Sequence, residues 1–213
     1  MTEEMILSFN DHGPSRLFAI RQMRALPMEK WLERAAKILP QEQTANTSPM
    51  DLAVRILERG LIALACAEPE ISGPLMEDLL RCCSAVDPDT GARTPCSSRA
   101  INQQVDDVRT LLQLRAASLR CNMSFVFEEG RRELTLPKES AFRRAVEERT
   151  YARTVNVPQV TAALISQGAA SLHDLRSTYT YGDAMDLLEI LNVRNYNYWA
   201  GAEAAERKAK RRI

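Results

Sequence analysis

The stretch INQQVDDVRTLLQLRAASLRCNMSFVF, residues 101–127, is the part of the sequence that decides the predicted fold. Its apolar residues recur at intervals of three, four and seven, which places them on one face of a helix. These residues are Ile101, Val105, Val108, Leu111, Leu112, Leu114, Leu119, Met123 and Val126. Neither Pro nor Gly interrupts the stretch. We therefore predict one continuous helix, ~40 Å long at ~1.5 Å per residue, as the core helix of a first domain.

Two short apolar runs lie near the start of the chain. Met5–Phe9 and Arg16–Arg21 alternate apolar and polar residues, and the turn residues Asn-Asp-His-Gly-Pro-Ser separate them. This pattern predicts a β-hairpin. Because an isolated hairpin is only marginally stable in water, we expect it to pack against helices.

Proline and serine mark the starts of three further helices. Pro27 opens the first, and Ser48 caps the second, because Pro is tolerated in the first turn and Ser accepts a hydrogen bond from an unpaired N–H. Residues 72–74 (Ser-Gly-Pro) predict the start of a third helix that runs through LMEDLLRCCSAV. Residues 87–98 are rich in Pro, Gly, Asp, Thr and Ser, and predict a surface loop.

The pattern changes after Phe127. Residues 128–140, EEGRRELTLPKES, carry charges, a Gly and a Pro, which is typical of a domain boundary. We therefore divide the chain into residues 1–130 and residues 131–213. The predicted fold class is mainly α: a helical bundle with a small N-terminal β-hairpin and a second, smaller helical domain.

Four helices are predicted in the second domain. A short charged helix covers residues 141–149, and a Pro-initiated helix covers residues 157–167 and ends at Gly168, which suits a left-handed C-terminal turn. Ser171 caps a third. The last helix, Tyr181–Arg212, is first amphipathic, then aromatic, then alanine-rich and finally basic.

Composition is that of an ordinary soluble globular protein, with 45% hydrophobic and 26% charged residues. The 28 basic and 28 acidic residues cancel, so no global field attracts nucleic acid or anionic lipid. No apolar run approaches the ~20 residues of a membrane span, and the start MTEEMILSFND lacks the pattern of a signal peptide. Together with an odd number of cysteines, this predicts a cytoplasmic protein with free thiols.

Residues that would carry out chemistry are scarce. His12 lies in a predicted turn and His173 at a helix start, and the chain has no His-Glu-x-x-His, P-loop or Gly-x-Ser-x-Gly motif. The five cysteines could suggest zinc, but their spacing fits no zinc module. We interpret them as small buried hydrophobic residues. We predict no catalytic residue, no metal ligand and no cofactor, and hence a protein that is not an enzyme.

Two parts of the C-terminal half carry patterns related to binding, one to nucleic acid and one to protein. Residues 157–179 have the helix–glycine–helix order of a helix-turn-helix, but the second helix carries one Arg and one Asp, and a DNA reader needs several donors. Five aromatic residues gather near the C-terminus: Tyr179, Tyr181, Tyr196, Tyr198 and Trp199. Such residues concentrate at protein interfaces. They could equally form the core of the second domain, and the sequence leaves both alternatives open.

The N-terminal half, over residues 5–129, resembles the tail assembly chaperones of long-tailed bacteriophages. The similar stretches are FAIRQMRALPMEKWLERAAKIL, LMEDLLRCC and LLQLRAASLRCNMSFVF. In the last of these, the residues that match the family pattern are Leu111, Leu114, Arg115, Asn122, Phe125 and Phe127. The later stretch SLHDLRSTYTYGDAMDLLEILNVRNYNYWAGAEAAER looks like a segment found downstream in such tail gene modules.

The resemblance implies a function in the host cell cytoplasm. Such chaperones bind the tape measure protein, shield its hydrophobic helices and recruit tail tube subunits, and some are made in short and long forms by ribosomal frameshifting; a junction at residues 129–140 would suit that arrangement. The partner-binding residues expected here are Trp31, Leu114, Phe125, Phe127, Tyr181, Leu188, Tyr196, Tyr198 and Trp199. The alternatives are a structural virion protein of the tail or baseplate and, less favoured, a small DNA-binding regulator that uses the basic tail at residues 207–212.

Overall fold

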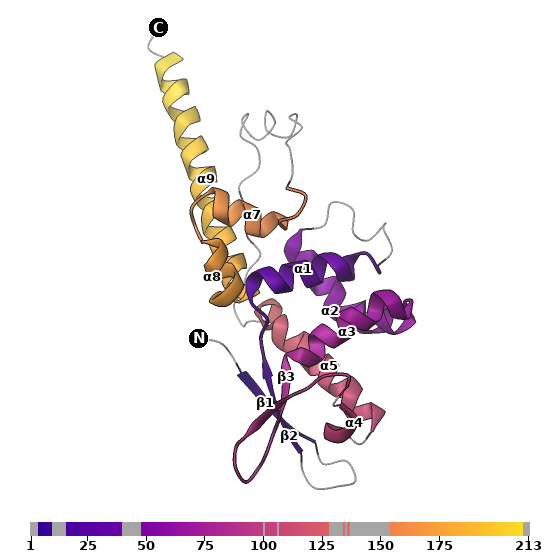
Figure 1. Cartoon of the computed structure of the whole chain (residues 1–213). Helices are drawn as coiled ribbons and strands as arrows, with labels where there is room; N and C mark the ends of the chain where they lie inside the picture. The colour runs from indigo at the N-terminus through magenta and orange to yellow at the C-terminus, as the bar shows by residue number, and fades with distance from the viewer. Residues whose placement is uncertain are drawn as a thin grey trace.

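The structure is a computed structural model, and it describes residues 4–9, 16–39, 48–99, 101–105, 107–127, 134, 136 and 154–210. Over these residues the fold is mostly helical, with a small antiparallel sheet of four strands near the N-terminus (Figure 1). The predicted mainly-α class is therefore confirmed, whereas a second domain is not. The predicted helix over residues 141–149 lies outside the described residues.

The sheet is built around the predicted hairpin. Strands β1 (Glu4–Phe9) and β2 (Arg16–Arg21) pair antiparallel, with Ile6 opposite Ala19. On its other side β2 pairs with β3 (Cys83–Val86), and β3 pairs with β4 (Arg93–Pro95). Phe18 and Ile20 of β2 share one face of the sheet, and they are fully buried because residues between 101 and 121 pack against that face. The hairpin is confirmed, and the chain adds two strands to it.

Two predictions around these added strands are wrong. Helix α3 (Pro69–Arg81) does not continue through residue 86, because the chain leaves it at Cys82 and pairs with the open edge of β2. Residues 87–98 are not only a loop, since they return as β4 around Gly91, which has a φ of 68°. Helix α3 also starts earlier than predicted, because Pro69 takes its first position and Pro74 falls inside it.

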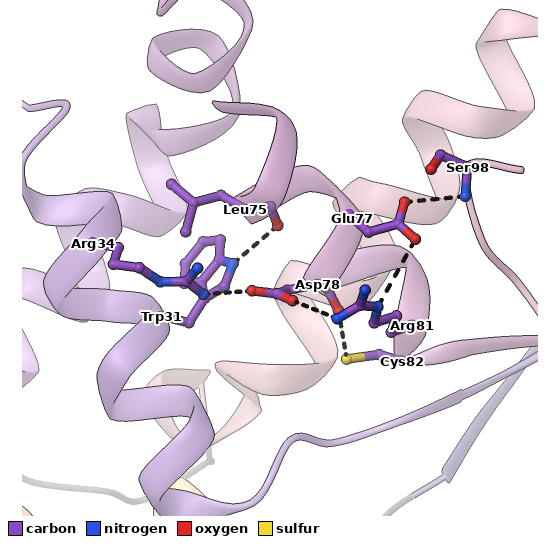
Figure 2. Close-up of polar contacts among 8 residues, drawn as sticks. All are labelled: Trp31, Arg34, Leu75, Glu77, Asp78, Arg81, Cys82 and Ser98. Carbon is purple, nitrogen blue, oxygen red and sulfur yellow. Dashed lines mark hydrogen bonds and ion pairs between the residues drawn. The ribbon is translucent and has the colours of Figure 1, made fainter. Parts of the chain in front are cut away.

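Helices α1 (Ala25–Ala36), α2 (Pro49–Cys66) and α3 form the centre of the main core. Ser48 accepts a hydrogen bond from the backbone N–H of Asp51, so the predicted cap of α2 is confirmed. Trp31 of α1 is fully buried, and its indole N–H donates to the Leu75 carbonyl of α3 at 3.0 Å (Figure 2). An ion pair between Arg34 and Asp78 joins the same two helices beside it.

The predicted continuous helix over residues 101–127 is broken. It consists of α4 (Ile101–Gln104), α5 (Val108–Asn122) and a 3₁₀ turn, η2 (Ser124–Phe127). The break arises because Asp107 is extended and caps a new helix: its carboxylate accepts from the Thr110 N–H at 2.8 Å. The new start changes which face is buried. Val108 is 71% exposed, whereas Leu114 is fully buried.

The C-terminal helices are α7 (Gln159–Ser166), α8 (Leu172–Ser177) and α9 (Tyr181–Lys210). Gly168 has a φ of 69°, as the predicted left-handed turn requires, and Ser171 forms a capping box with Asp174. The first half of α9 packs against α1 and α7, and its second half extends beyond them (Figure 1).

The C-terminal helices share a core with α1. Its buried members come from α1 and from all three later helices: Ala25, Leu26, Val160, Leu164, Leu175, Ala184 and Leu191. Glu29 of α1, also buried, accepts hydrogen bonds from the start of α7. This packing crosses the boundary predicted between residues 130 and 131, and it makes α1 common to both parts of the chain.

Candidate partner-binding groove

An apolar groove runs between α2 and α5. It consists of two hollows, about 700 Å³ and about 290 Å³ in volume, which share Leu61 and Ala116. The apolar residues that line it are Val54, Leu57, Leu61, Ile62, Ala65, Cys66, Met76, Val108, Leu112, Ala116, Leu119, Val126 and Phe127. We call this surface the α2–α5 groove.

The helical repeat explains why these side chains meet. Ala53, Ile56 and Leu64 turn one face of α2 into the main core, and the neighbouring positions 54, 57, 61 and 65 then face α5. On α5 the break at Asp107 directs Val108 and Leu112, one turn apart, towards the same groove. The sequence therefore places apolar residues on a larger part of α2 and α5 than their own core covers.

Several large apolar side chains of this groove remain open to water. Ile62 is 72% exposed, Val108 71% and Leu112 51%, and Phe127 at the other end of the groove is 59% exposed. A contiguous exposed apolar surface with a polar rim is typical of a site for another protein. A groove between two helices is a common receptor for an amphipathic helix.

The polar rim of the groove is mainly basic. Arg109, Arg115 and Arg120 line it from α5, and Glu58 lines it from α2. Burial lowers the pKa of Arg115, although the nearby Glu77 carboxylate opposes this. The Nε of Arg115 is buried and has no hydrogen-bond partner within the described part of the chain.

Hydrogen bonds fix the C-terminal end of α5 against residues 22–23, which connect β2 to α1. The Asn122 side chain accepts from the Met23 N–H and donates to the Ser118 carbonyl at 2.8 Å. Gln22 donates to the Cys121 carbonyl at 2.9 Å and to the Ser124 hydroxyl at 2.8 Å. Asn122, which belongs to the stretch similar to the phage chaperones, is therefore a buried structural residue in this fold.

Four of the nine predicted partner-binding residues lie in the core. Trp31 and Leu114 are fully buried, and Phe125 and Tyr181 are each 3% exposed. The rings of Phe125 and Tyr181 pack edge to face with centroids 5.6 Å apart, which joins η2 to the start of α9. These four side chains offer no surface to a partner in this structure, and we assign them to packing.

The other five predicted residues are spread over two places. Phe127 lines the α2–α5 groove. Leu188 packs on the core that α1 shares with the C-terminal helices, and Tyr196 is half-buried on the same helix, α9. Tyr198 and Trp199 are 68% and 37% exposed, and their rings pack edge to face with centroids 5.0 Å apart. The nine residues therefore do not form one site, and the aromatic residues divide between core and surface.

Sequence reasoning missed Ile62 and missed the exposure of Val108 and Leu112 in the groove. One signal was present for α2: the run LIALAC after Gly60 places apolar residues on nearly every side of the helix. A helix with a single buried face needs apolar residues on only part of its surface. The surplus indicated a second apolar contact. For α5 no such signal existed, because the direction of its face depends on the break at Asp107.

The five cysteines are free thiols that differ in burial. Cys83, Cys96 and Cys121 are buried, as predicted, and burial raises the pKa of Cys83 and Cys96. The prediction is wrong for Cys66, which is exposed at the end of α2. Over the described residues, no group of three or more His, Cys, Asp or Glu side chains is placed to hold a metal ion.

Within the described ranges, no helix is both long enough and apolar enough to cross a bilayer. Comparisons of the chain with protein-family models, with curated proteins and with solved structures gave no match.

Proposed function

We propose that this protein is a non-enzymatic tail assembly chaperone of a long-tailed bacteriophage. In the host cytoplasm it binds helices of the tape measure protein and helps to recruit tail tube subunits. The observation that supports this most is the α2–α5 groove, in which Ile62, Val108 and Leu112 are exposed. The resemblance of residues 5–129 to the chaperone family supplies the kind of partner.

The groove suits a contact that is made and then released. Fully burying an aliphatic side chain of this size contributes about 1.5–3 kcal/mol, and three such side chains are open in the groove. Association costs an estimated 4–15 kcal/mol in lost motion, so these contacts alone favour modest affinity. Modest affinity suits a chaperone, because the polymerising tube protein must displace it from the tape measure protein.

The test is co-expression with the tape measure protein of the same phage. We expect a co-purifying complex and a larger soluble fraction of the tape measure protein. The double variant I62D/L112D places two carboxylates in the groove, and it should reduce co-purification at least ~tenfold, which corresponds to about 1.4 kcal/mol. The control I190D changes a residue on α9 that is also exposed, at 63%, and should bind as the wild type does. Equal binding by both variants, or no complex with the wild type, would reject the proposal.

A structural virion protein of the tail or baseplate is the second candidate. It is favoured by the second half of α9, which carries the exposed Tyr198 and Trp199 and which a permanent neighbour could cover. Mass spectrometry of purified particles separates the two candidates. A chaperone is absent from the finished particle, and a structural subunit is present in constant number.

A further inference from the structure

A second groove lies along α1, between the end of β2 and the end of α3. Its volume is about 1060 Å³, and its lining comes from the β2–α1 junction, α1, the end of α3, residues 155–156 and α8. None of these residues lines the α2–α5 groove. We call this surface the α1 groove. It combines residues from the N-terminal sheet with residues from the C-terminal helices.

The lining of the α1 groove carries more basic than acidic side chains, although the whole chain is neutral. Six basic side chains line it: Arg21, Arg24, Lys30, Arg34, Arg81 and Arg176. The acidic side chains in its lining are Glu33 and Asp78. Since the chain has 28 basic and 28 acidic residues, this excess is a local feature. Clefts lined by one sign of charge concentrate ligands of the opposite sign.

Part of this positive charge is already paired. Arg34 and Arg81 share the Asp78 carboxylate, as Figure 2 shows, and Arg81 also lies 3.8 Å from Glu77. Arg24 donates one hydrogen bond to the Thr178 carbonyl at 2.9 Å.

Arg21 also forms an ion pair, with the Glu4 carboxylate at 3.0 Å. Two cations in the groove have no such partner among the described residues. Lys30 and Arg176 make no hydrogen bond or ion pair with the described part of the chain. Lys30 is exposed on α1 and Arg176 is exposed on α8. Within the described part of the chain, these two cations, one from α1 and one from α8, are therefore free to pair with an anionic ligand.

The chemistry between these cations favours a peptide over a nucleic acid. Met23, Pro27 and Val155 supply apolar surface, and Val155 is 94% exposed. No aromatic side chain is present in the described lining, so the groove lacks the stacking surfaces on which single-stranded bases rest. The neutral chain also lacks the extended basic field that draws phosphate backbones.

We propose that the α1 groove binds an acidic peptide segment of a partner protein. Carboxylates of the segment pair with Lys30 and Arg176, and its apolar side chains lie on Met23 and Pro27. This inference does not rest on the proposed chaperone function, because the α1 groove and the α2–α5 groove share no residue.

The experiment measures binding of a fluorescein-labelled peptide of three Glu-Asp-Leu-Glu repeats by fluorescence anisotropy. We expect binding at ~50 mM salt that weakens at ~300 mM, since exposed ion pairs are screened. The variant K30E/R176E should raise the Kd at least ~tenfold. The control R59E/K208E makes the same change in net charge at exposed positions on α2 and α9, and should bind as the wild type does.

Three results would overturn the proposal: no binding by the wild type, an equal loss in both double variants, or tighter binding of a twelve-nucleotide oligo-dT that K30E/R176E abolishes. Circular dichroism verifies that each variant is folded. The groove variant I62D/L112D should retain the peptide, so failure of this proposal and failure of the proposed chaperone function are distinguishable.

Discussion

Replacing Glu29 with Gln tests how α1 holds the C-terminal helices. Glu29 is 5% exposed, and its carboxylate accepts from the Val160 N–H at 2.6 Å, the Thr161 N–H at 3.0 Å and the Thr161 hydroxyl at 2.7 Å. The two N–H groups lie in the first turn of α7, where a helix has no internal acceptor for them. Glu29 therefore caps a helix that lies more than a hundred residues later in the chain.

The expected loss follows from the atoms that Gln cannot replace. Gln has one acceptor oxygen, so its NH₂ group faces the Thr161 N–H and leaves that buried donor unpaired, which costs about 1–3 kcal/mol. The favourable contact of a negative charge with a helix N-terminus, about 0.3–1 kcal/mol, is also lost. The neutral amide of Gln also avoids the free-energy cost of burying a charge, and this offsets part of the loss. We expect E29Q to lower the free energy of unfolding by about 1–2 kcal/mol near neutral pH.

The pH dependence has a definite sign. Burial raises the pKa of Glu29 above its ordinary value of 4.5, although the hydrogen bonds from Thr161 and Val160 oppose the increase. A carboxyl group whose pKa is raised by folding stabilises the folded state most when it is protonated. The contribution of Glu29 to wild-type stability therefore falls as the pH rises from about 4.5 through the raised pKa. The difference between wild type and E29Q should be larger at low pH than at high pH.

Urea unfolding at several pH values measures both effects. The control is E33Q, which alters an exposed carboxylate one turn along α1 and should change stability by less than about 0.5 kcal/mol. Hydrogen exchange should be faster at the amides of Val160 and Thr161 in E29Q and unchanged in E33Q. If the two variants have the same stability at every pH, Glu29 does not act as the cap described here.

Two further predictions concern Gly182 and the cysteines. A Cβ at Gly182 would lie 3.1 Å from the Phe125 Cβ, so G182A should be destabilised by about 1 kcal/mol. A Cβ at Gly201 of the same helix meets nothing within 4 Å, so G201A should be stabilised by about 0.5–1 kcal/mol. Thermal unfolding measures both changes, and the reverse order of stabilities would contradict the close approach of α9 to η2. A thiol reagent such as DTNB should label the exposed Cys66 in the folded protein and label Cys83 only on unfolding, because burial raises the pKa of Cys83; rapid labelling of Cys83 in the folded protein would contradict its place in the core.

Local signals were predicted well from the sequence. Ser48, Gly168 and Ser171 each act within one turn of their own helix end, so a few neighbouring residues determine what they do. The hairpin of β1 and β2 is local for the same reason, since its two strands are consecutive.

The errors came from interactions that are not local. Residues 83–86 form a strand because β2, more than sixty residues earlier, offers them an open edge. The capping of α5 by Asp107 ended a helix that apolar periodicity alone would continue, and this changed which side chains face the α2–α5 groove. The candidate groove could not be predicted in full for this reason: an apolar stripe does not show which part of it another helix will cover.

The shared packing of α1 sets an order of events during synthesis. Val160 follows Glu29 by 131 residues, which a ribosome adds in roughly 7–26 s at about 5–20 residues per second. Throughout that interval Ala25 and Leu26 lack their later neighbours, and the Glu29 carboxylate has no helix to cap. A product that stopped near residue 130 would keep this state permanently. In such a short product the apolar residues Ala25 and Leu26 of α1 would stay exposed to other proteins, whereas in the full-length chain the C-terminal helices bury them.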